Sequence, residues 1–123
     1  MEFRLFDSLG FHIGSTAKVL TEHLNKCFAE AGYPIRKEQW ILMIRLTESD
    51  GINQRALCDE CMMDKVQLTR LLDGLEAMNW ISRKSDSDDR RNKLIYVTKK
   101  GKDSVEELMQ VVQNVMQIGR AHV

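Results

Sequence analysis

The sequence predicts a mostly α-helical fold that carries one small β-hairpin. Three observations support this fold class. Apolar residues recur at steps of three and four along most of the chain, which is the period of an amphipathic helix. After Asn79 the period changes to two, which is the period of a strand. The segment 84–92, between the two predicted strands, is entirely polar or charged, as expected for a hairpin loop.

Length and composition bound the class of protein. The chain has 123 residues, with 18 Lys and Arg, 18 Asp and Glu, and three cysteines. This length fits one domain over 1–123, and the charge balance excludes a uniformly basic protein. No apolar run reaches the roughly 20 residues of a membrane helix, and the first residues lack a secretion signal. We therefore expect a cytoplasmic protein with reduced cysteines and no membrane partner.

A break at Gly32-Tyr33-Pro34 separates the first two predicted helices, 6–31 and 37–47. Gly32 suits the position just past the first helix, and Pro34 cannot continue it. The apolar face of the first helix consists of Leu5, Leu9, Ile13, Ala17, Leu20, Leu24, Cys27 and Phe28. The second helix is apolar on most sides, so we expect it to be central and buried. Its apolar residues are Trp40, Ile41, Met43, Ile44 and Leu46.

Two further helices are predicted over 54–61 and 65–78, each after a residue that suits an N-cap. Asn53 precedes the first of them and Asp64 precedes the second. Asn79 is expected to end the second helix in the left-handed conformation. The inward residues of the second helix are Val66 or Leu68, Leu71, Leu72, Leu75 and Met78.

Two strands, 80–83 and 93–98, and a final helix from residue 98 or 99 complete the predicted elements. The strands form a hairpin with a long, positively charged tip. The final helix has a narrow apolar seam, which is similar to that of a coiled coil. This seam consists of Val105, Leu108, Val112 and Val115.

The segment 83–102 gathers positive charge in an otherwise neutral chain. It holds eight basic and three acidic residues, so the remaining residues sum to −5. A directional field of this kind suits a polyanionic partner, whereas an isolated patch is more often a solvated loop. The neighbouring elements favour the polyanion. Helix, turn, helix and a two-stranded ribbon follow one another as in a winged helix-turn-helix, whose second helix enters the major groove of DNA.

Candidate DNA-binding residues lie on the second of these helices and on the hairpin. They are Lys65, Gln67, Thr69, Arg70, Arg90, Arg91 and Lys93. Phosphate contacts are expected from Lys65, Arg90, Arg91 and Lys93. Base-edge contacts are expected from Gln67, Thr69 and Arg70. Asp89 is expected to support the wing by bracing one of its arginines through a charge-assisted hydrogen bond.

This part of the chain resembles the MarR/SlyA family of bacterial transcription regulators. The resemblance rests on three stretches within 64–101, namely residues 71–83, Asp89-Arg90-Arg91-Asn92-Lys93 and Val97-Thr98-Lys99-Lys100-Gly101. The chain departs from the family pattern at Asn79, where the family usually has Gly. It also departs at Asp88, in place of a first wing Arg, and at Val97, in place of Leu.

The resemblance implies a ligand-responsive repressor that binds double-stranded DNA as a homodimer. It implies a winged helix-turn-helix over 34–98, flanked by dimerisation helices over 1–31 and 99–117. It also implies a small aromatic or phenolic effector, bound between the dimerisation helices and the winged domain. The candidate pocket residues are His12, Trp40 and Met43, although packing or surface roles explain such residues equally well.

Several sequence features argue against a metal-binding protein or an enzyme. Cys58 and Cys61 form a C-x-x-C pair inside one short helix with no second pair, so we expect structural cysteines and no metal. Cys27 has no adjacent activating base. No nucleophile motif or phosphate-binding loop is present, so we expect no enzyme and no cofactor. The terminal segment 118–123 resembles a translated sequencing adapter and is expected to be non-native. The alternative function is a winged-helix protein-interaction module without DNA-binding activity.

Overall fold

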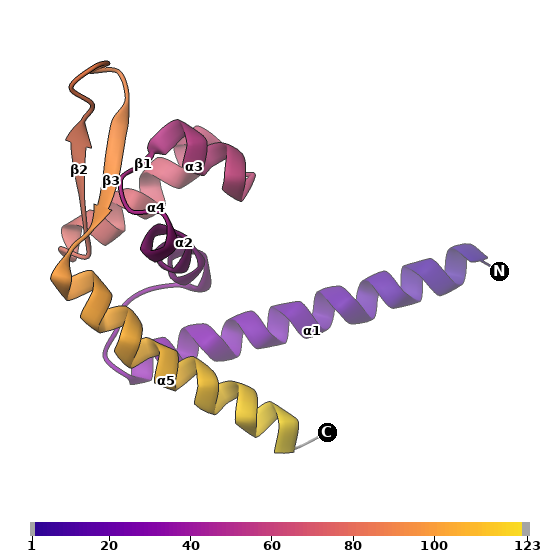
Figure 1. The fold of residues 1–123 in the computed structure, drawn as a ribbon. Coiled ribbons are helices and arrows are strands. Elements are labelled where there is room, and N and C mark those ends of the chain that lie inside the picture. Colours follow the sequence, from indigo (N-terminus) through magenta and orange to yellow (C-terminus); the bar gives the residue numbers. More distant parts are fainter. Residues whose placement is uncertain (1, 122–123) are drawn as a thin grey trace.

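The structure, a computed structural model, describes the backbone of residues 2–121 and the side chains of residues 8, 9 and 11–114. The predicted fold class is confirmed, because a β-hairpin lies between the last two helices of a mostly helical chain (Figure 1). The elements are α1 (Glu2–Glu30), α2 (Lys37–Glu48), β1 (Ile52–Asn53), α3 (Gln54–Cys61), α4 (Lys65–Ala77), β2 (Ile81–Ser85), β3 (Lys93–Val97) and α5 (Lys99–Ala121).

The ends of α3 and α4 carry the residues that the sequence predicts for them. The Asn53 carboxamide oxygen accepts a hydrogen bond from the Arg55 backbone N–H at 2.8 Å. The Asp64 carboxylate accepts one from the Gln67 backbone N–H, also at 2.8 Å. Beyond α4, Asn79 has a φ of 62°, which is the predicted left-handed conformation. These local bonds fix where α4 starts and stops, and thereby which of its residues face outward.

The strands form a three-stranded antiparallel sheet in the order β1-β3-β2. β2 and β3 pair from Ile81 opposite Val97 to Ser85 opposite Lys93. The sequence does not predict β1, because two residues are too few to display an alternating pattern. The strand pairs with β3, with Ile52 opposite Ile95. Just before it, the Asp50 carboxylate accepts a hydrogen bond from the Val97 backbone N–H at 3.0 Å.

The hydrophobic core surrounds α2, as predicted. Leu42, Met43 and Leu46 of this helix have no exposed surface. The Trp40 ring packs against Phe28 of α1, with ring centroids 5.9 Å apart. The other buried apolar residues come from α3, α4, the sheet, α5 and the connecting segments, and include Ile35, Leu57, Leu68, Leu72, Leu75, Trp80, Ile81, Ile95, Val97, Val105 and Leu108.

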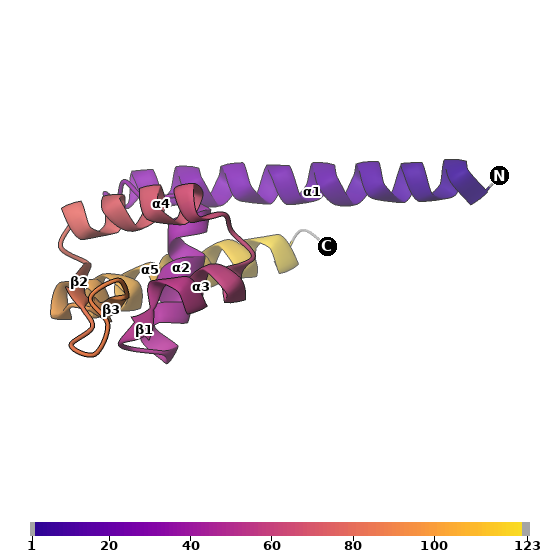
Figure 2. The ribbon, with the colours of Figure 1, turned by 90° about the horizontal axis from the view of Figure 1, so that it is seen from above.

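Most of α1 does not pack on this core, although the sequence predicts one long apolar face for it. Figure 2 shows α1 as a straight rod that extends past the other elements. Only its C-terminal part packs on the core, through Leu24 and Phe28. Leu9 and Ile13, on the same face, are 48% and 68% exposed. The period identifies an apolar face but not what covers it, and among the side chains that the structure describes none buries Leu9 or Ile13. The side chains of Leu5 and Val115 lie outside the described residues.

Different elements form the two ends of the molecule. In Figure 1 the β2–β3 hairpin, α3 and α4 lie at one end, and α1 and α5 lie at the other, with α2 between them.

None of the helices in the described range is long and apolar enough to cross a membrane. The expected tail 118–123 cannot be assessed, because its side chains and all of residues 122–123 lie outside the part that the structure describes.

Candidate nucleic-acid interface

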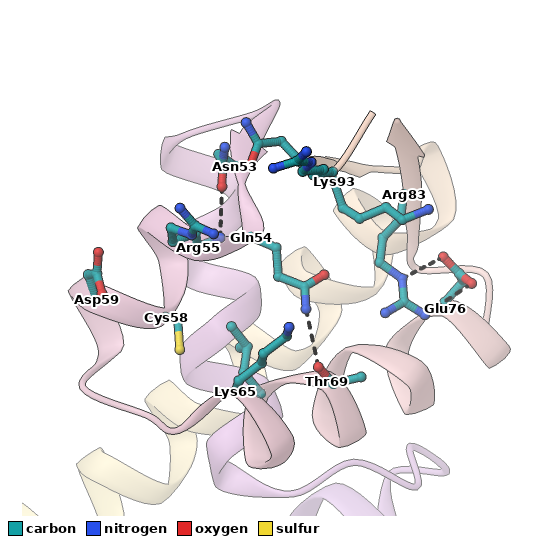
Figure 3. A pocket seen from close by; sticks show the side chains of 13 residues that line it. Asn53, Gln54, Arg55, Cys58, Asp59, Lys65, Thr69, Glu76, Arg83 and Lys93 are labelled. Atoms are coloured by element: carbon teal, nitrogen blue, oxygen red, sulfur yellow. Dashed lines mark hydrogen bonds and ion pairs between the residues drawn. The ribbon is translucent and has the colours of Figure 1, made fainter. Parts of the chain in front are cut away.

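A concave groove of about 680 Å³ lies between the hairpin, α3 and α4 (Figure 3). Five basic and two acidic side chains line it. The full lining consists of Asn53, Gln54, Arg55, Cys58, Asp59, Lys65, Leu68, Thr69, Glu76, Arg83, Arg91, Asn92 and Lys93. We call this surface the groove. It brings together residues from both elements that the sequence predicts to contact DNA.

The packing of α4 decides which of its side chains reach the groove. Leu68, Leu72 and Leu75 are fully buried against the core, so they define the inward side of the helix. Lys65 and Thr69 lie one turn apart and line the groove. The alternative that the sequence left open is thereby decided, because Leu68 is the inward residue and Val66 is 69% exposed.

A hydrogen bond between α3 and α4 orients the Thr69 side chain. The Gln54 amide nitrogen donates to the Thr69 hydroxyl oxygen at 3.2 Å, as the dashed line in Figure 3 shows. The hydroxyl then accepts from Gln54 and keeps its own hydrogen for a further acceptor. Thr69 can therefore act as a donor toward a phosphate or a base in the groove.

The loop between β2 and β3 is shaped by carboxylates that bind its own backbone. The Asp86 carboxylate accepts from the Asp88 N–H at 3.0 Å, and the Asp89 carboxylate accepts from the Arg91 N–H at 3.0 Å. Asp89 thus braces the backbone of a wing arginine and not its guanidinium, which differs from the expected contact. A short aspartate side chain reaches a backbone N–H two residues ahead more readily than a distant guanidinium. The guanidiniums of Arg90 and Arg91 remain exposed.

Arg83 is the one arginine of the basic segment that is bound by carboxylates. Its Nη2 lies 2.6 Å from Asp73 Oδ1, and its Nε lies 3.0 Å from Glu76 Oε2 (Figure 3 shows the Glu76 contact). Hydrogen bonding to Arg83 lowers the pKa of Glu76, and the same bond raises the pKa of Arg83. The charge of Arg83 is therefore neutralised within the fold, and it links β2 to α4.

The other predicted cations carry no such partners. Lys65, Arg70, Arg90, Arg91 and Lys93 are exposed, and none pairs with a carboxylate whose side chain the structure describes. Of the seven predicted DNA-binding residues, Lys65, Thr69, Arg91 and Lys93 line the groove. Gln67, Arg70 and Arg90 are exposed beyond its lining.

Sequence reasoning assigned no DNA contact to three groove residues at the start of α3, the helix before the predicted recognition helix. They are Asn53, which is the N-cap of α3, and Gln54 and Arg55, which begin it. Arg55 is exposed and adds a further cation to the lining. Its position in the first turn of the first helix of a helix-turn-helix was an available signal, since that helix crosses the DNA backbone in such motifs.

The candidate effector residues do not form one pocket within a single chain. Met43 is fully buried and Trp40 is 8% exposed, and both belong to the core. His12 is exposed on α1. It lies sixteen residues before Phe28, the contact of Trp40, which corresponds to about 24 Å along the helix.

The cysteines have local structural partners. The Cys58 thiol donates to the Met63 backbone carbonyl at 2.8 Å, which ties the end of α3 to the following turn. Burial raises the pKa of the Cys61 thiol, which keeps it protonated near neutral pH. The expectation that no base adjoins Cys27 is wrong, because its Sγ lies 3.9 Å from Nε2 of His23, one turn earlier on α1. No group of three or more potential metal ligands is present among the residues that the structure describes.

Known proteins match both the sequence and the fold. Residues 35–93, from just before α2 to the start of β3, match the MarR family. The HTH-type transcriptional regulator SarZ of Staphylococcus epidermidis is 29% identical over 83 residues, which make up 68% of this chain and 56% of that protein. The chain therefore spans little more than half the length of that relative.

Solved structures agree over a larger part of the chain. A MarR transcriptional regulator from Methanosarcina mazei Go1 has a TM-score of 0.82 and 25% identity, covering 95% of this chain and 83% of that one. Reduced AbfR, solved bound to DNA, has a TM-score of 0.83 at 20% identity, covering 92% of this chain and 78% of that one. Over residues 35–93 the chain is therefore similar to the MarR family, and over nearly its whole length it shares the fold of a solved MarR transcriptional regulator.

Proposed function

We propose that the chain is a sequence-specific regulator of transcription that binds double-stranded DNA. The positive charge of the groove is the main support for this proposal. Its five basic side chains outnumber its two acidic ones, and one of the acidic ones, Glu76, is already compensated by Arg83. Arg55, Lys65, Arg91 and Lys93 remain available for phosphates.

The shape of this surface also suits a duplex. α4 has 13 residues, which corresponds to a rod about 20 Å long, and the major groove of B-DNA admits one α-helix. The hairpin stands beside α4, so it would reach the backbone or the minor groove next to the site that α4 occupies. Arginine suits a narrow minor groove, and Arg90 and Arg91 are exposed in the loop at the end of this hairpin. AbfR, which has the same fold, is solved bound to DNA.

The proposal further includes a homodimer that acts as a repressor in the cytoplasm. A dimer would cover the uncovered apolar face of α1 and would present two copies of α4 to two half-sites. A small aromatic or phenolic effector is proposed to release it from DNA. Because His12 lies far from Trp40 and Met43 within one chain, an effector site that uses all three requires a second protomer.

A salt titration with random-sequence duplex DNA tests the DNA-binding proposal. We expect the logarithm of the association constant to fall steeply with the logarithm of salt concentration, by nearly one unit per neutralised phosphate. Arg91→Ala is expected to weaken binding to all sequences and to reduce that slope by about one. Gln67→Ala is expected to change the preferred sequence instead.

Lys18→Ala is the matched control, because Lys18 is an exposed cation on α1, away from the groove. It is expected to leave the slope unchanged. Equal affinity of the wild type and Arg91→Ala for duplex DNA would remove the hairpin from the interface. A wild type with no salt-dependent affinity would favour the protein-interaction module.

A further inference from the structure

An exposed valine occupies the centre of the outward face of α4. Successive residues of a helix are rotated by about 100°, so the side opposite the buried Leu68 and Leu72 is occupied by Val66 and Arg70. Val66 is 69% exposed. Its neighbours in sequence, Lys65 and Gln67, are exposed and polar. An apolar side chain at the outermost position of a polar helix face has no structural role in the chain itself.

We infer that Val66 recognises thymine by packing against the C5 methyl group in the major groove. This inference rests on the proposed DNA-binding function. Thymine is the only base that presents a methyl group in the major groove of unmodified DNA. Residues near the N-terminus of a recognition helix are the ones that contact base edges, and Val66 is the second residue of α4. Its β-branched side chain has little rotamer freedom, so a contact costs little entropy.

The surroundings favour a base over a protein as the occupant of this face. Val66 is surrounded by Lys65, Gln67 and Arg70, and the groove beside it is predominantly basic. The other exposed large apolar residue of this region is Met62, in the turn before α4, at 92% exposure. Two such side chains fall well short of the roughly 800 Å² that each partner buries in a standard protein interface. A single methyl-sized contact within a polyanion-binding surface fits the chemistry better.

Base analogues test this inference directly. A preferred duplex is first selected from a random library with the wild type, and each thymine in it is then replaced singly by uracil, which lacks the methyl group. We expect one thymine, or a symmetry-related pair, at which uracil weakens wild-type binding about three- to tenfold. 5-Bromouracil, whose bromine has nearly the size of a methyl group, is expected to restore the affinity.

Variants of the protein then assign the effect to Val66. In Val66→Ser the thymine-to-uracil ratio at that position is expected to fall to about one, whereas Val66→Ile is expected to keep it. Val19→Ser is the matched control, because Val19 is a similarly exposed valine on α1, at 65%. Any loss of folding or dimerisation changes the affinity for both duplexes alike, so the ratio remains informative.

The outcomes separate the two proposals. If the wild type binds duplex DNA with a steep salt dependence but shows no Val66-dependent thymine preference, the inference on Val66 is overturned and the DNA-binding function stands. If the wild type binds no duplex at any salt concentration, the function is overturned and the inference with it. A thymine preference that persists in Val66→Ser would assign the methyl contact to another residue and overturn the inference.

Discussion

Gly101 ends one of the three stretches that resemble the MarR/SlyA family, and the structure shows why a glycine stands there. It lies in the first turn of α5, where its backbone N–H donates to the Thr98 hydroxyl at 3.0 Å. The Thr98 hydroxyl in turn donates to the Asn79 backbone carbonyl. A methyl group on Gly101 would overlap the Trp80 backbone carbonyl oxygen and would lie 3.1 Å from Val97 Cγ1. The absence of a side chain is what lets α5 start against the beginning of β2.

Gly101→Ala is therefore expected to destabilise the protein, by about 2–3 kcal/mol, because backbone must move to admit the methyl group. Urea unfolding followed by circular dichroism measures this change. Gly14→Ala is the matched control, since Gly14 is also helical but has nothing within 4 Å of the added carbon. It is expected to stabilise by about 0.5–1 kcal/mol. Equal stability of Gly101→Ala and the wild type would contradict this account.

At this scale the sequence predicts the residues whose role is local. Asn53, Asp64 and Asn79 act on backbone groups within a few positions, so spacing along the chain identifies them. Gln54 and Arg83 escape such reasoning, because their partners lie 15 and 7–10 residues away and depend on the tertiary fold. By charge alone Arg83 counts as a free cation, whereas in the structure Asp73 and Glu76 neutralise it.

Among the elements, α4 and β2 are joined by the carboxylate pair that binds Arg83. The Arg83 side chain is 18% exposed, whereas the side chains of Glu76 and Asp73 are 44% and 60% exposed, so solvent screens part of the attraction. Arg83→Met removes the link but keeps the length of the side chain. We expect a loss of about 1–2 kcal/mol in unfolding free energy by urea titration at pH 7. Lys84→Met, on the same strand, is the control and is expected to change stability less.

The same link predicts a pH dependence. The pKa of Glu76 is lowered in the folded state from an ordinary value of 4.5, because Arg83 donates hydrogen bonds to its ionised carboxylate. A depressed pKa contributes stability that is fully present above the ordinary value and is lost as pH falls through the folded-state pKa. The stability difference between the wild type and Arg83→Met is therefore expected to shrink in acid. A difference that stays constant between pH 7 and pH 3 would exclude Glu76 as the partner.

Element order was predictable because the period and the end residues coincide in α3 and α4. Two outcomes were not predictable, and each has a physical reason. β1 is held by pairing with β3 and by Asp50, which are long-range contacts that leave no local pattern. The apolar stripe of α1 has the period of a core helix, yet periodicity does not reveal whether the chain itself or another molecule covers the stripe.

For the whole molecule, charge and apolar surface are separated between two ends. The groove and the hairpin lie at one end, and the exposed apolar part of α1 lies toward the other (Figure 1). A neutral chain with this polarity can direct one end to a polyanion while the other associates with apolar surface. The basic surface could be predicted in outline from the sequence, whereas the contribution of the α3 residues depends on the packing of α3 against α4.

The uncovered stripe of α1 predicts self-association. Leu9, Ile13 and Leu20 lie within about 40° of one another around the helix and are 48%, 68% and 42% exposed, and the same stripe continues into the buried core contacts. We expect twice the mass of the chain in sedimentation equilibrium at micromolar concentration. The double variant Ile13→Glu and Leu20→Glu is expected to sediment as a monomer, because a buried, unpaired carboxylate strongly disfavours the interface.

The control for this experiment is Lys18→Glu, on the opposite side of the same helix, which is expected to leave the dimer intact. The functional consequence is expected at the other end of the molecule. A dimer gains affinity from engaging two half-sites at once, so the wild type should prefer a duplex with two half-sites over a duplex with one. The double variant should lose this preference while retaining the salt dependence of each single site. A monomeric wild type, or a dimer that Ile13→Glu and Leu20→Glu leave intact, would show that the exposed stripe of α1 is not the dimer interface.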